Sequence, residues 1–415
     1  MSLDFYRFSI SWSRLLPNGF PNYVSEDGKR YYNKLIDGLL AKGIEPVVTI
    51  YHWDLPQRLQ DLGGWTNSLI TEWFVDYADV VFALFGDRVK TWITINEPLI
   101  FCDASYSKSL LMAPGVNDSE VGMYLCGKNV LLAHAKAYRL YQKKYKARFH
   151  GLLSFANQAS WFEGLTAADE ELAELANQYT VGRHSHPVYS KEGGWPPVIE
   201  KLISEKSAKE GFFQSRLPPF TNEEKELVRG TFDFYALNHY TSRTVRMKRP
   251  GELVAGFPMR GVPELDLILE GRPEWPVATS EWLFVYPQGL RQILRWVKKH
   301  YGDIPIFITE NGYSSVGGNL EDQDRLQYYK GYLEQVLLAM KEDGVNVIGY
   351  TAWSLIDNFE WMDGYRSKFG LCEVDFSDPL RTRKLRRSGH FYAEVIRRRS
   401  LDIGPEYRWL RAHMF

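Results

Sequence analysis

The chain has 415 residues, of which 45% are hydrophobic, 15% aromatic and 24% charged, and its formal net charge is −1. This composition excludes an intrinsically disordered chain, and a net charge near zero argues against a protein that binds nucleic acid through bulk positive charge. Three cysteines are too few for a disulfide framework, and no uncharged apolar run reaches the roughly 18 residues that a membrane span requires.

Seven short runs rich in β-branched and aromatic residues predict β-strands. They cover residues 5–10, 46–51, 91–95, 151–155, 232–237, 305–309 and 345–351. Most of these runs are continuously apolar, which is typical of parallel strands that are buried on both faces. Asp4 and Arg7 interrupt the start of the chain, so its first residues predict a strand rather than a signal peptide.

Amphipathic segments between these runs predict helices. They cover residues 31–41, 70–85, 127–145, 289–300 and 324–340, and a final helix holds Phe391 and Val395 four residues apart. The alternation of strand and helix predicts an α/β fold with a parallel sheet. Seven strands suit an open doubly wound sheet, whereas a (β/α) barrel requires eight. We expect residues 1–415 to form one domain, with residues 156–229 and 243–282 as insertions in it.

Polar and aromatic side chains gather where five of these strands end. They are His52 and Trp53, Asn96 and Glu97, Asn238 and Tyr240, Glu310, and Trp353 with Glu360 and Trp361 beyond it. In a parallel barrel the carboxyl ends of all strands open on one face, where such enzymes place their active sites.

Glu97 and Glu310 form a natural pair for glycoside hydrolysis. One carboxyl group must protonate the leaving oxygen, and the other must attack the anomeric carbon or activate a water molecule. Two carboxylates in one pocket also push their pKa values apart, so that one stays protonated near neutral pH. The tryptophans at the neighbouring strand ends offer apolar faces to a sugar ring.

Five separated motifs, in order along the chain, resemble those of family 1 glycoside hydrolases, in the style of insect β-glucosidases. They are Phe-Tyr-Arg-Phe-Ser-Ile-Ser-Trp at 5–12, Tyr-His-Trp-Asp-Leu-Pro at 51–56, Thr-Ile-Asn-Glu-Pro at 94–98, Ile-Thr-Glu-Asn-Gly at 308–312 and Trp-Ser-Leu-Ile-Asp-Asn-Phe-Glu-Trp at 353–361. The family's fold is a TIM (β/α)8 barrel. The resemblance implies that the seven runs are strands two to eight, that the first βα unit is missing, and that residues 5–10 and 348–353 form unpaired edges.

The resemblance implies a role for each candidate residue. Glu97 is expected to be the acid/base and Glu310 the nucleophile, with Tyr240 bonded to Glu310 and Arg7 beside both glutamates. The substrate-binding residues are expected to be His52, Trp53, Asn96, Asn238, Tyr240, Trp353, Glu360 and Trp361. Of these, Asn96 would bind the sugar 2-hydroxyl, and Glu360 the 4- and 6-hydroxyls, where a carboxylate would repel a 6-phosphate.

Each of these residues also has a structural explanation. His52 is also compatible with a core imidazole bonded to the backbone, Tyr240 and Trp353 with barrel packing, Arg7 with a structural ion pair, and Glu360 with a surface carboxylate. Cys102 and Cys126 are equally compatible with a disulfide and with two free thiols.

Two segments depart from the family's usual pattern: residues 105–109, where relatives are often Gly-rich, and residues 182–187. Arg183 and His184 stand in the stretch 182–187, where relatives usually carry bulky apolar residues, and we expect them to disturb the packing. We also expect His184 and His186, which are two residues apart, to lie on a loop.

The resemblance implies a retaining β-glucosidase that hydrolyses O-glycosidic bonds of small β-glucosides through a covalent intermediate. Two alternatives stay open: a catalytically inactive or unstable truncated relative, and a thioglucosidase. We expect no cofactor, no metal and no nucleic-acid or membrane partner, and the sequence indicates no particular oligomeric state. The family resemblance suggests a secreted protein.

Overall fold

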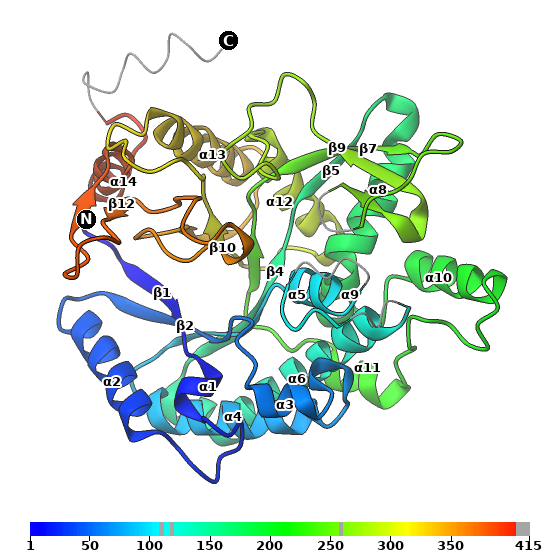
Figure 1. Cartoon of the computed structure of the whole chain (residues 1–415), viewed down its shortest axis with the longest axis horizontal. Coiled ribbons are helices and arrows are strands. Elements are labelled where there is room, and N and C mark those ends of the chain that lie inside the picture. Colours follow the sequence, from blue (N-terminus) through cyan, green and yellow to red (C-terminus); the bar gives the residue numbers. More distant parts are fainter. Residues whose placement is uncertain (108–111, 117–119, 257–259, 404–415) are drawn as a thin grey trace.

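Seven parallel strands form the centre of the protein in a computed structural model, which describes residues 1–107, 112–116, 120–256 and 260–403 (Figure 1). Their order in the sheet is β1-β2-β3-β4-β6-β10-β11. The strands are β1 (Phe5–Ser9), β2 (Glu45–Tyr51), β3 (Thr91–Asn96), β4 (Leu152–Gln158), β6 (Tyr235–Asn238), β10 (Ile306–Asn311) and β11 (Val347–Ala352). All seven strands that the sequence predicts are therefore present, in one nearly closed barrel.

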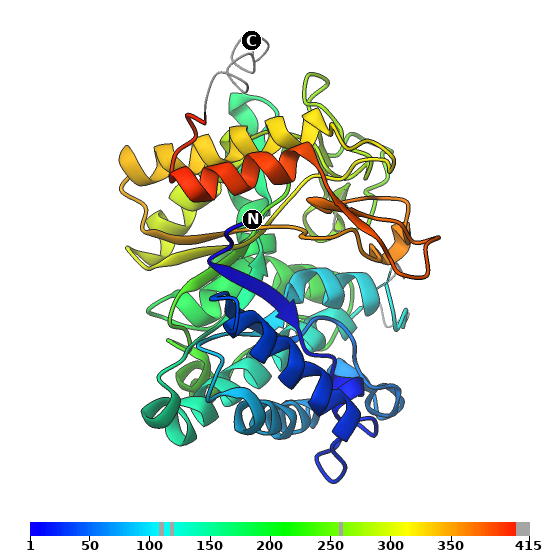
Figure 2. The same ribbon diagram turned by 90° about the vertical axis from the view of Figure 1, so that its left-hand side faces the viewer.

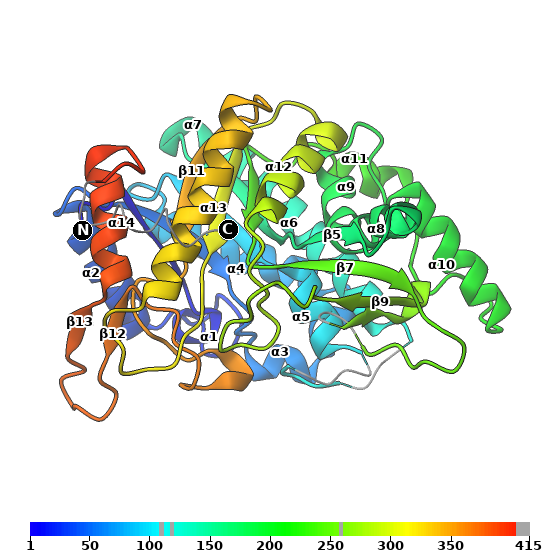
Figure 3. The same ribbon diagram turned by 90° about the horizontal axis from the view of Figure 1, so that it is seen from above.

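Helices connect successive strands and cover the outside of this barrel (Figure 3). They are α1 (Trp12–Leu15), α2 (Glu26–Leu40), α3 (Gln57–Asp61), α4 (Ile70–Phe85), α5 (Pro98–Ser105), α6 (Gly122–Lys144), α7 (Lys146–Phe149), α12 (Gln288–Tyr301), α13 (Gln323–Lys341) and α14 (Arg387–Arg398). The helices that the sequence predicts match α2, α4, α6, α12, α13 and α14, with most ends displaced by a few residues.

The buried faces of these helices explain why the middle strands are apolar on both sides. Every residue of β6 and β10 is buried, and in β2 only Glu45, the first residue, is exposed. One face of each strand points into the barrel and the other meets a helix, so no face is left for alternating polar residues.

The insertions form a second, smaller unit beside the barrel. Its sheet has the order β5-β7-β9-β8 and comprises β5 (Trp161–Gly164), β7 (Ser242–Met247), β8 (Gly261–Val262) and β9 (Leu267–Glu270). Its helices are α8 (Glu170–Asn177), α9 (Arg183–Tyr189), α10 (Pro197–Lys209) and α11 (Asn222–Val228). His184 and His186 lie in α9, so the prediction of a loop there is wrong: the apolar neighbours that bury α9 outweigh the weak helical pattern of its sequence.

The barrel has one open seam, between β1 and β11. In the described part of the chain each of these strands pairs with one neighbour only, β1 with β2 and β11 with β10. The residues of β1 are all half-buried, and Ile348 on β11 is 51% exposed. Figure 2 shows β1 and α14 on this side of the molecule, where Arg399 pairs with Asp4.

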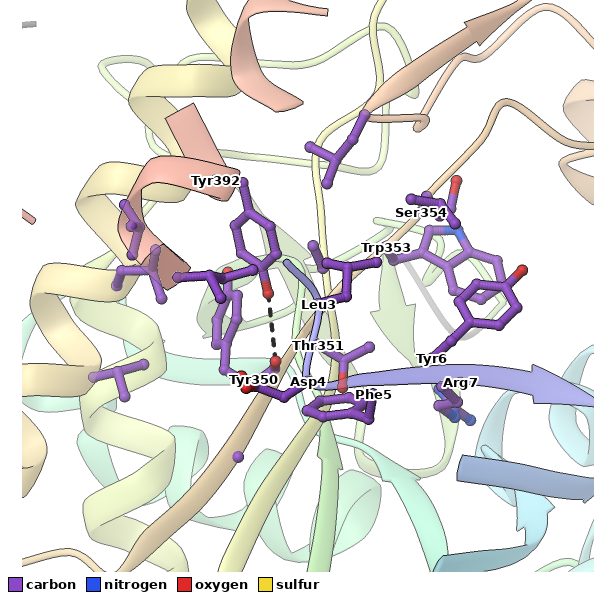
Figure 4. A pocket seen from close by; sticks show the side chains of 18 of the residues that line it. Leu3, Asp4, Phe5, Tyr6, Arg7, Tyr350, Thr351, Trp353, Ser354 and Tyr392 are labelled. Atoms are coloured by element: carbon purple, nitrogen blue, oxygen red, sulfur yellow. Dashed lines mark hydrogen bonds between the residues drawn. The ribbon is translucent and has the colours of Figure 1, made fainter. Parts of the chain in front are cut away.

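A cavity of about 950 Å³ fills the seam. It is lined by both edge strands and by residues of α13 and α14 (Figure 4). Its wall includes Phe5, Tyr350 and Tyr392. The cavity also reaches Arg7, in the middle of β1, and Trp353, which directly follows β11.

The structure resolves the alternative that the sequence leaves open for the cysteines. Cys102 on α5 and Cys126 on α6 form a disulfide whose Cα atoms are 5.5 Å apart, and both residues are fully buried. The bond ties the helix that follows β3 to the long helix that leads to β4.

No helix among residues 1–107, 112–116, 120–256 and 260–403 is long and apolar enough to cross a membrane.

Candidate active site

Glu97 and Glu310 lie close enough to interact electrostatically at the ends of two strands of the barrel. Glu97 follows β3 directly, and Glu310 is the last residue but one of β10. Both carboxyl groups therefore lie on the face of the barrel where the parallel strands end. Both residues are buried, at 6% and 4% exposure. Asn238, at the end of β6, lies between them: its Nδ2 donates to Glu97 Oε1 at 2.9 Å, and its Oδ1 accepts from Thr309 Oγ1 at 2.6 Å.

The Glu310 carboxylate accepts hydrogen bonds from two sides. Arg7 Nη1 lies 2.5 Å from Oε1, and the Tyr240 hydroxyl donates to Oε2 at 2.6 Å. Burial, together with the negative charge of Glu310, raises the pKa of Tyr240 well above its ordinary value, so the hydroxyl keeps the proton that it donates. Arg7 compensates the charge of Glu310, and the two side chains are 4% and 5% exposed, so the pair is stronger than one on the surface.

Glu97 is held in the opposite protonation state. Burial, and next the negative charge of Glu310, raise the pKa of Glu97 to about 8, while Asn238 and Arg7 oppose the shift. The raised pKa of Glu97 favours its neutral, protonated form near neutral pH, whereas Glu310 accepts hydrogen bonds from two donors. This is the division of roles that an acid and a nucleophile require.

Asn96 connects the candidate residues of β1, β2 and β3. Its Oδ1 accepts from Arg7 Nη2 at 2.6 Å, and its Nδ2 lies 3.2 Å from His52 Nε2. Burial, and then the positive charge of Arg7, lower the pKa of His52 to about 3, so the imidazole is neutral. Trp53 Nε1 donates to the Asn96 carbonyl oxygen at 2.7 Å, which fixes the indole over the same strand end.

Three aromatic side chains surround His52. The ring of Trp353 lies 5.9 Å and that of Trp361 5.8 Å from the imidazole, and Trp361 also lies 4.4 Å from Trp53. Trp353 Nε1 donates to Glu360 Oε1 at 3.1 Å. Glu360 is half-buried, and this burial raises the pKa of its carboxyl group to about 7.

The structure thus brings the candidate residues from the sequence into one cluster of contacting side chains, and it adds two. Thr49 accepts from Arg7 Nε through Oγ1 at 3.1 Å, and Thr309 fixes the amide of Asn238. The sequence offers a signal for both, because each is a threonine inside an otherwise apolar run that ends at a candidate residue.

Among the residues with described positions, no group of three or more His, Cys, Asp or Glu side chains is arranged to hold a metal ion.

Comparison with known proteins places this pocket in a family. The model of Glycosyl hydrolase family 1 matches residues 1–401. Myrosinase 1 of Brevicoryne brassicae is 45% identical over 401 residues, which cover 95% of this chain and 84% of the relative. Cytosolic beta-glucosidase of Homo sapiens is 39% identical over 408 residues, which cover 97% and 85% of the two chains.

Solved structures agree with these relatives. The aphid myrosinase has a TM-score of 0.88 at 44% identity, with 95% of this chain and 84% of that chain covered. A mutant of the rice Os3BGlu6 beta-glucosidase, in a covalent complex with Glc, has a TM-score of 0.85 at 37% identity, with 94% and 84% covered. The chain belongs to glycosyl hydrolase family 1 and is a glycoside hydrolase.

Proposed function

We propose that this protein is a retaining β-glucosidase in which Glu310 is the nucleophile and Glu97 the acid/base. The observation that carries the proposal is the unequal environment of the two carboxyl groups. Arg7 and the Tyr240 hydroxyl contact Glu310 at 2.5 and 2.6 Å, whereas burial raises the pKa of Glu97 to about 8. A nucleophile must be ionised and an acid must carry a proton, and these contacts favour those states.

In the first step, a Glu310 oxygen attacks the anomeric carbon while Glu97 gives its proton to the glycosidic oxygen. The bond from the anomeric carbon to that oxygen breaks, and the aglycone leaves as an alcohol. In the second step, Glu97, now ionised, takes a proton from water as the water oxygen attacks the same carbon. Glucose leaves, and Glu310 returns to a carboxylate.

The neighbouring side chains suit the binding of an unphosphorylated glucose unit. Asn96, already oriented by Arg7 and His52, is proposed to bind the 2-hydroxyl, and Glu360 to bind the 4- and 6-hydroxyls. Trp353 and Trp361 are proposed to contact the sugar ring, with His52 and Trp53 at the cleavage point and Asn238 holding Glu97. A phosphate at the 6-position would meet the Glu360 carboxyl group and be repelled once that group ionises.

The stereochemistry of the first product tests the mechanism. Hydrolysis of an aryl β-glucoside, followed by proton NMR during the first minutes, is expected to release β-glucose before mutarotation. Release of α-glucose as the first product would show inversion and rule out a covalent intermediate.

A thioglucosidase is the second candidate, and one finding favours it: Myrosinase 1 of Brevicoryne brassicae is 45% identical to this chain. The presence of Glu97 favours O-glucosides, because an alkoxide leaving group requires a proton more than a thiolate does. The ratio of kcat/KM for matched O- and S-glucosides separates the two. We expect the O-glucoside to be hydrolysed faster.

The open seam motivates a third candidate, an inactive relative that binds sugar without turnover. We propose that the family's eighth parallel strand belongs between β1 and β11, that residues 1–415 are otherwise one barrel domain, and that this barrel is active. The cavity of about 950 Å³ between two strand edges supports a place for such a strand. Turnover of an aryl β-glucoside by the purified 415-residue chain would exclude the inactive candidate.

We also propose that the protein works in an oxidising compartment. The Cys102–Cys126 disulfide supports this, since such bonds persist mainly in secreted and extracellular proteins.

A further inference from the structure

Arg183 is a fully buried arginine in the insertion, where the sequence leads us to expect disturbed packing. It is 2% exposed, and its Nη2 lies 2.6 Å from Asp103 Oδ2. Its guanidinium group lies 4.6 Å from the ring of Tyr179 and 5.4 Å from that of Tyr124. Two aromatic faces and one carboxylate contact Arg183, but its Nε and Nη1 are buried without a hydrogen-bond partner among the described residues. The same holds for both ring nitrogens of His184, so polar groups of both residues are left unsatisfied in this segment.

The carboxylate that Arg183 contacts lies on α5, the helix that begins directly after Glu97. Glu97 is the residue that caps α5: it has φ 46° and ψ 66°, and its carbonyl oxygen accepts from the Ile100 amide at 3.1 Å. Its own amide donates to the Ala156 carbonyl at 2.8 Å. The backbone of Glu97 is thus part of the first turn of α5, and any tilt of this short helix moves the acid.

Two adjacent residues near the far end of α5 anchor it to different parts of the protein. Cys102 ties α5 to α6 through the disulfide, and Asp103 ties it to α9 through Arg183. The disulfide alone would leave α5 free to rotate about Cys102. The ion pair of Asp103 with Arg183 points in another direction and prevents this rotation. Asp103 is 2% exposed, so its ionised carboxylate depends on a nearby positive charge.

We propose that Arg183 is a positioning residue for the acid/base: through Asp103 it fixes the tilt of α5 and thereby aims Glu97 at the glycosidic oxygen. The inference rests on the proposed function of Glu97. Proton donation depends on geometry, and a misplacement of about 1 Å costs on the order of 100-fold in rate. Arg183 itself does not touch the substrate.

The alternative is that the pair only keeps two buried charges compensated. The two accounts differ when both charges are removed. A buried ion pair replaced by apolar residues of similar size usually leaves a protein as stable as before. If the pair only compensates charge, the double variant R183M/D103L recovers activity; if the pair positions α5, the double variant folds but keeps the defect in proton donation.

The dependence of rate on the leaving group reports proton donation separately from folding. The phenol of phenyl β-glucoside needs a proton on its oxygen in order to leave. The 2,4-dinitrophenolate of 2,4-dinitrophenyl β-glucoside leaves without that proton. The ratio of the two kcat/KM values, measured on one preparation, is independent of the folded fraction. A merely structural role lowers both values equally and leaves this ratio unchanged.

The experiment measures this ratio for the full chain, R183M, R183K and R183M/D103L. Arg216 provides a matched control, because it is another buried arginine that pairs with a carboxylate, Glu264, at 2.7 and 2.9 Å, and Glu264 lies outside α5. For R183M and the double variant we expect kcat/KM to fall about 100-fold on phenyl β-glucoside and less than about threefold on the dinitrophenyl substrate. R183K is expected to recover part of the loss, and R216M to keep the ratio of the unaltered chain.

Two results would overturn the inference. One is a ratio in R183M equal to that of the unaltered chain. The other is a double variant whose ratio returns to that value. Either result leaves the proposed function intact if the unaltered chain turns over both substrates. An unaltered chain with no turnover contradicts the proposed function itself, and the inference falls with it.

Discussion

The closed part of the barrel and its open seam differ in burial, yet both contribute to one pocket. Strands β3, β6 and β10 each have two neighbours, and they carry Glu97, Asn238 and Glu310. The edge strand β1 has one described neighbour, and β11 has one as well, but Arg7 comes from β1 and Trp353 directly follows β11. The carboxyl groups of the proposed acid/base and nucleophile therefore stand at strands with two neighbours, while one charge partner and one proposed sugar-binding ring stand at the seam.

This comparison also shows that a strand at the edge of a sheet can hold a buried side chain. The backbone of β1 is at an edge, but the Arg7 side chain is 4% exposed, because it points inward onto Glu310, Asn96 and Thr49. The seam cavity nevertheless reaches Arg7, His52 and Trp353, so it is continuous with the candidate site. The following predictions test how far the seam weakens that site.

The largest effect is expected from Glu310, in the closed part. E310Q keeps the shape of the side chain but removes the nucleophile, so kcat on an aryl β-glucoside should fall by about 10⁴-fold or more. The control is E321Q, whose glutamate has a side chain that is 77% exposed, and which should keep full activity. Turnover by E310Q within tenfold of the unaltered chain would contradict the assignment.

The two donors to Glu310 compare the seam with the closed part directly. R7M removes a buried charge from β1, and Y240F removes one hydroxyl after β6. We expect kcat/KM to fall by about 100-fold or more for R7M and by roughly tenfold to 100-fold for Y240F, since the loss of a charged partner costs more. R30M, on the exposed side of α2, is the control. A smaller effect for R7M than for Y240F would mean that the seam leaves Arg7 loosely placed.

The pH dependence tests the state of Glu97. Because its pKa is raised to about 8, kcat/KM for phenyl β-glucoside should fall about tenfold per pH unit above that value. The folded protein also binds a proton that the unfolded chain, with an ordinary value of 4.5, has released, so stability should decrease as pH rises from 4.5 to about 8. E97Q lacks the pH-dependent loss of stability that Glu97 causes. The difference in Tm between E97Q and the unaltered chain should therefore favour E97Q most near pH 8. An equal gain at pH 5 and pH 8 would be evidence against a neutral Glu97.

The smallest expected effect is a change in the free energy of unfolding when one isoleucine in each region is shortened to valine. Ile308 on β10 is fully buried, whereas Ile348 on β11 is 51% exposed. Ile308→Val should lower the free energy of unfolding by about 1 kcal/mol, and Ile348→Val should change it by less than about 0.5 kcal/mol. Urea denaturation measures both. Equal losses would indicate that the β11 edge is covered in solution.

Most of the fold is predictable because it rests on local patterns. Continuous apolar runs predict all seven strands, and strand-end residues such as Asn96 and Glu310 predict the pocket. Contacts between distant residues carry no such pattern. Arg183 and Asp103 are 80 residues apart, and nothing near either residue indicates a partner. The same holds for the parallel pairing of β5 with β7, which begins with Trp161 and Ser242. For Cys102 and Cys126 the sequence names the pair but does not decide between a disulfide and two thiols.

The most direct test of the central claim is to trap the covalent intermediate. The 415-residue chain is incubated with a slow 2-fluoro-glucoside, digested and analysed by mass spectrometry. We predict a single modified peptide, with the fluoroglucosyl group on Glu310 and with activity lost in step with labelling. Labelling of Glu97, or of any other residue in place of Glu310, would contradict the account.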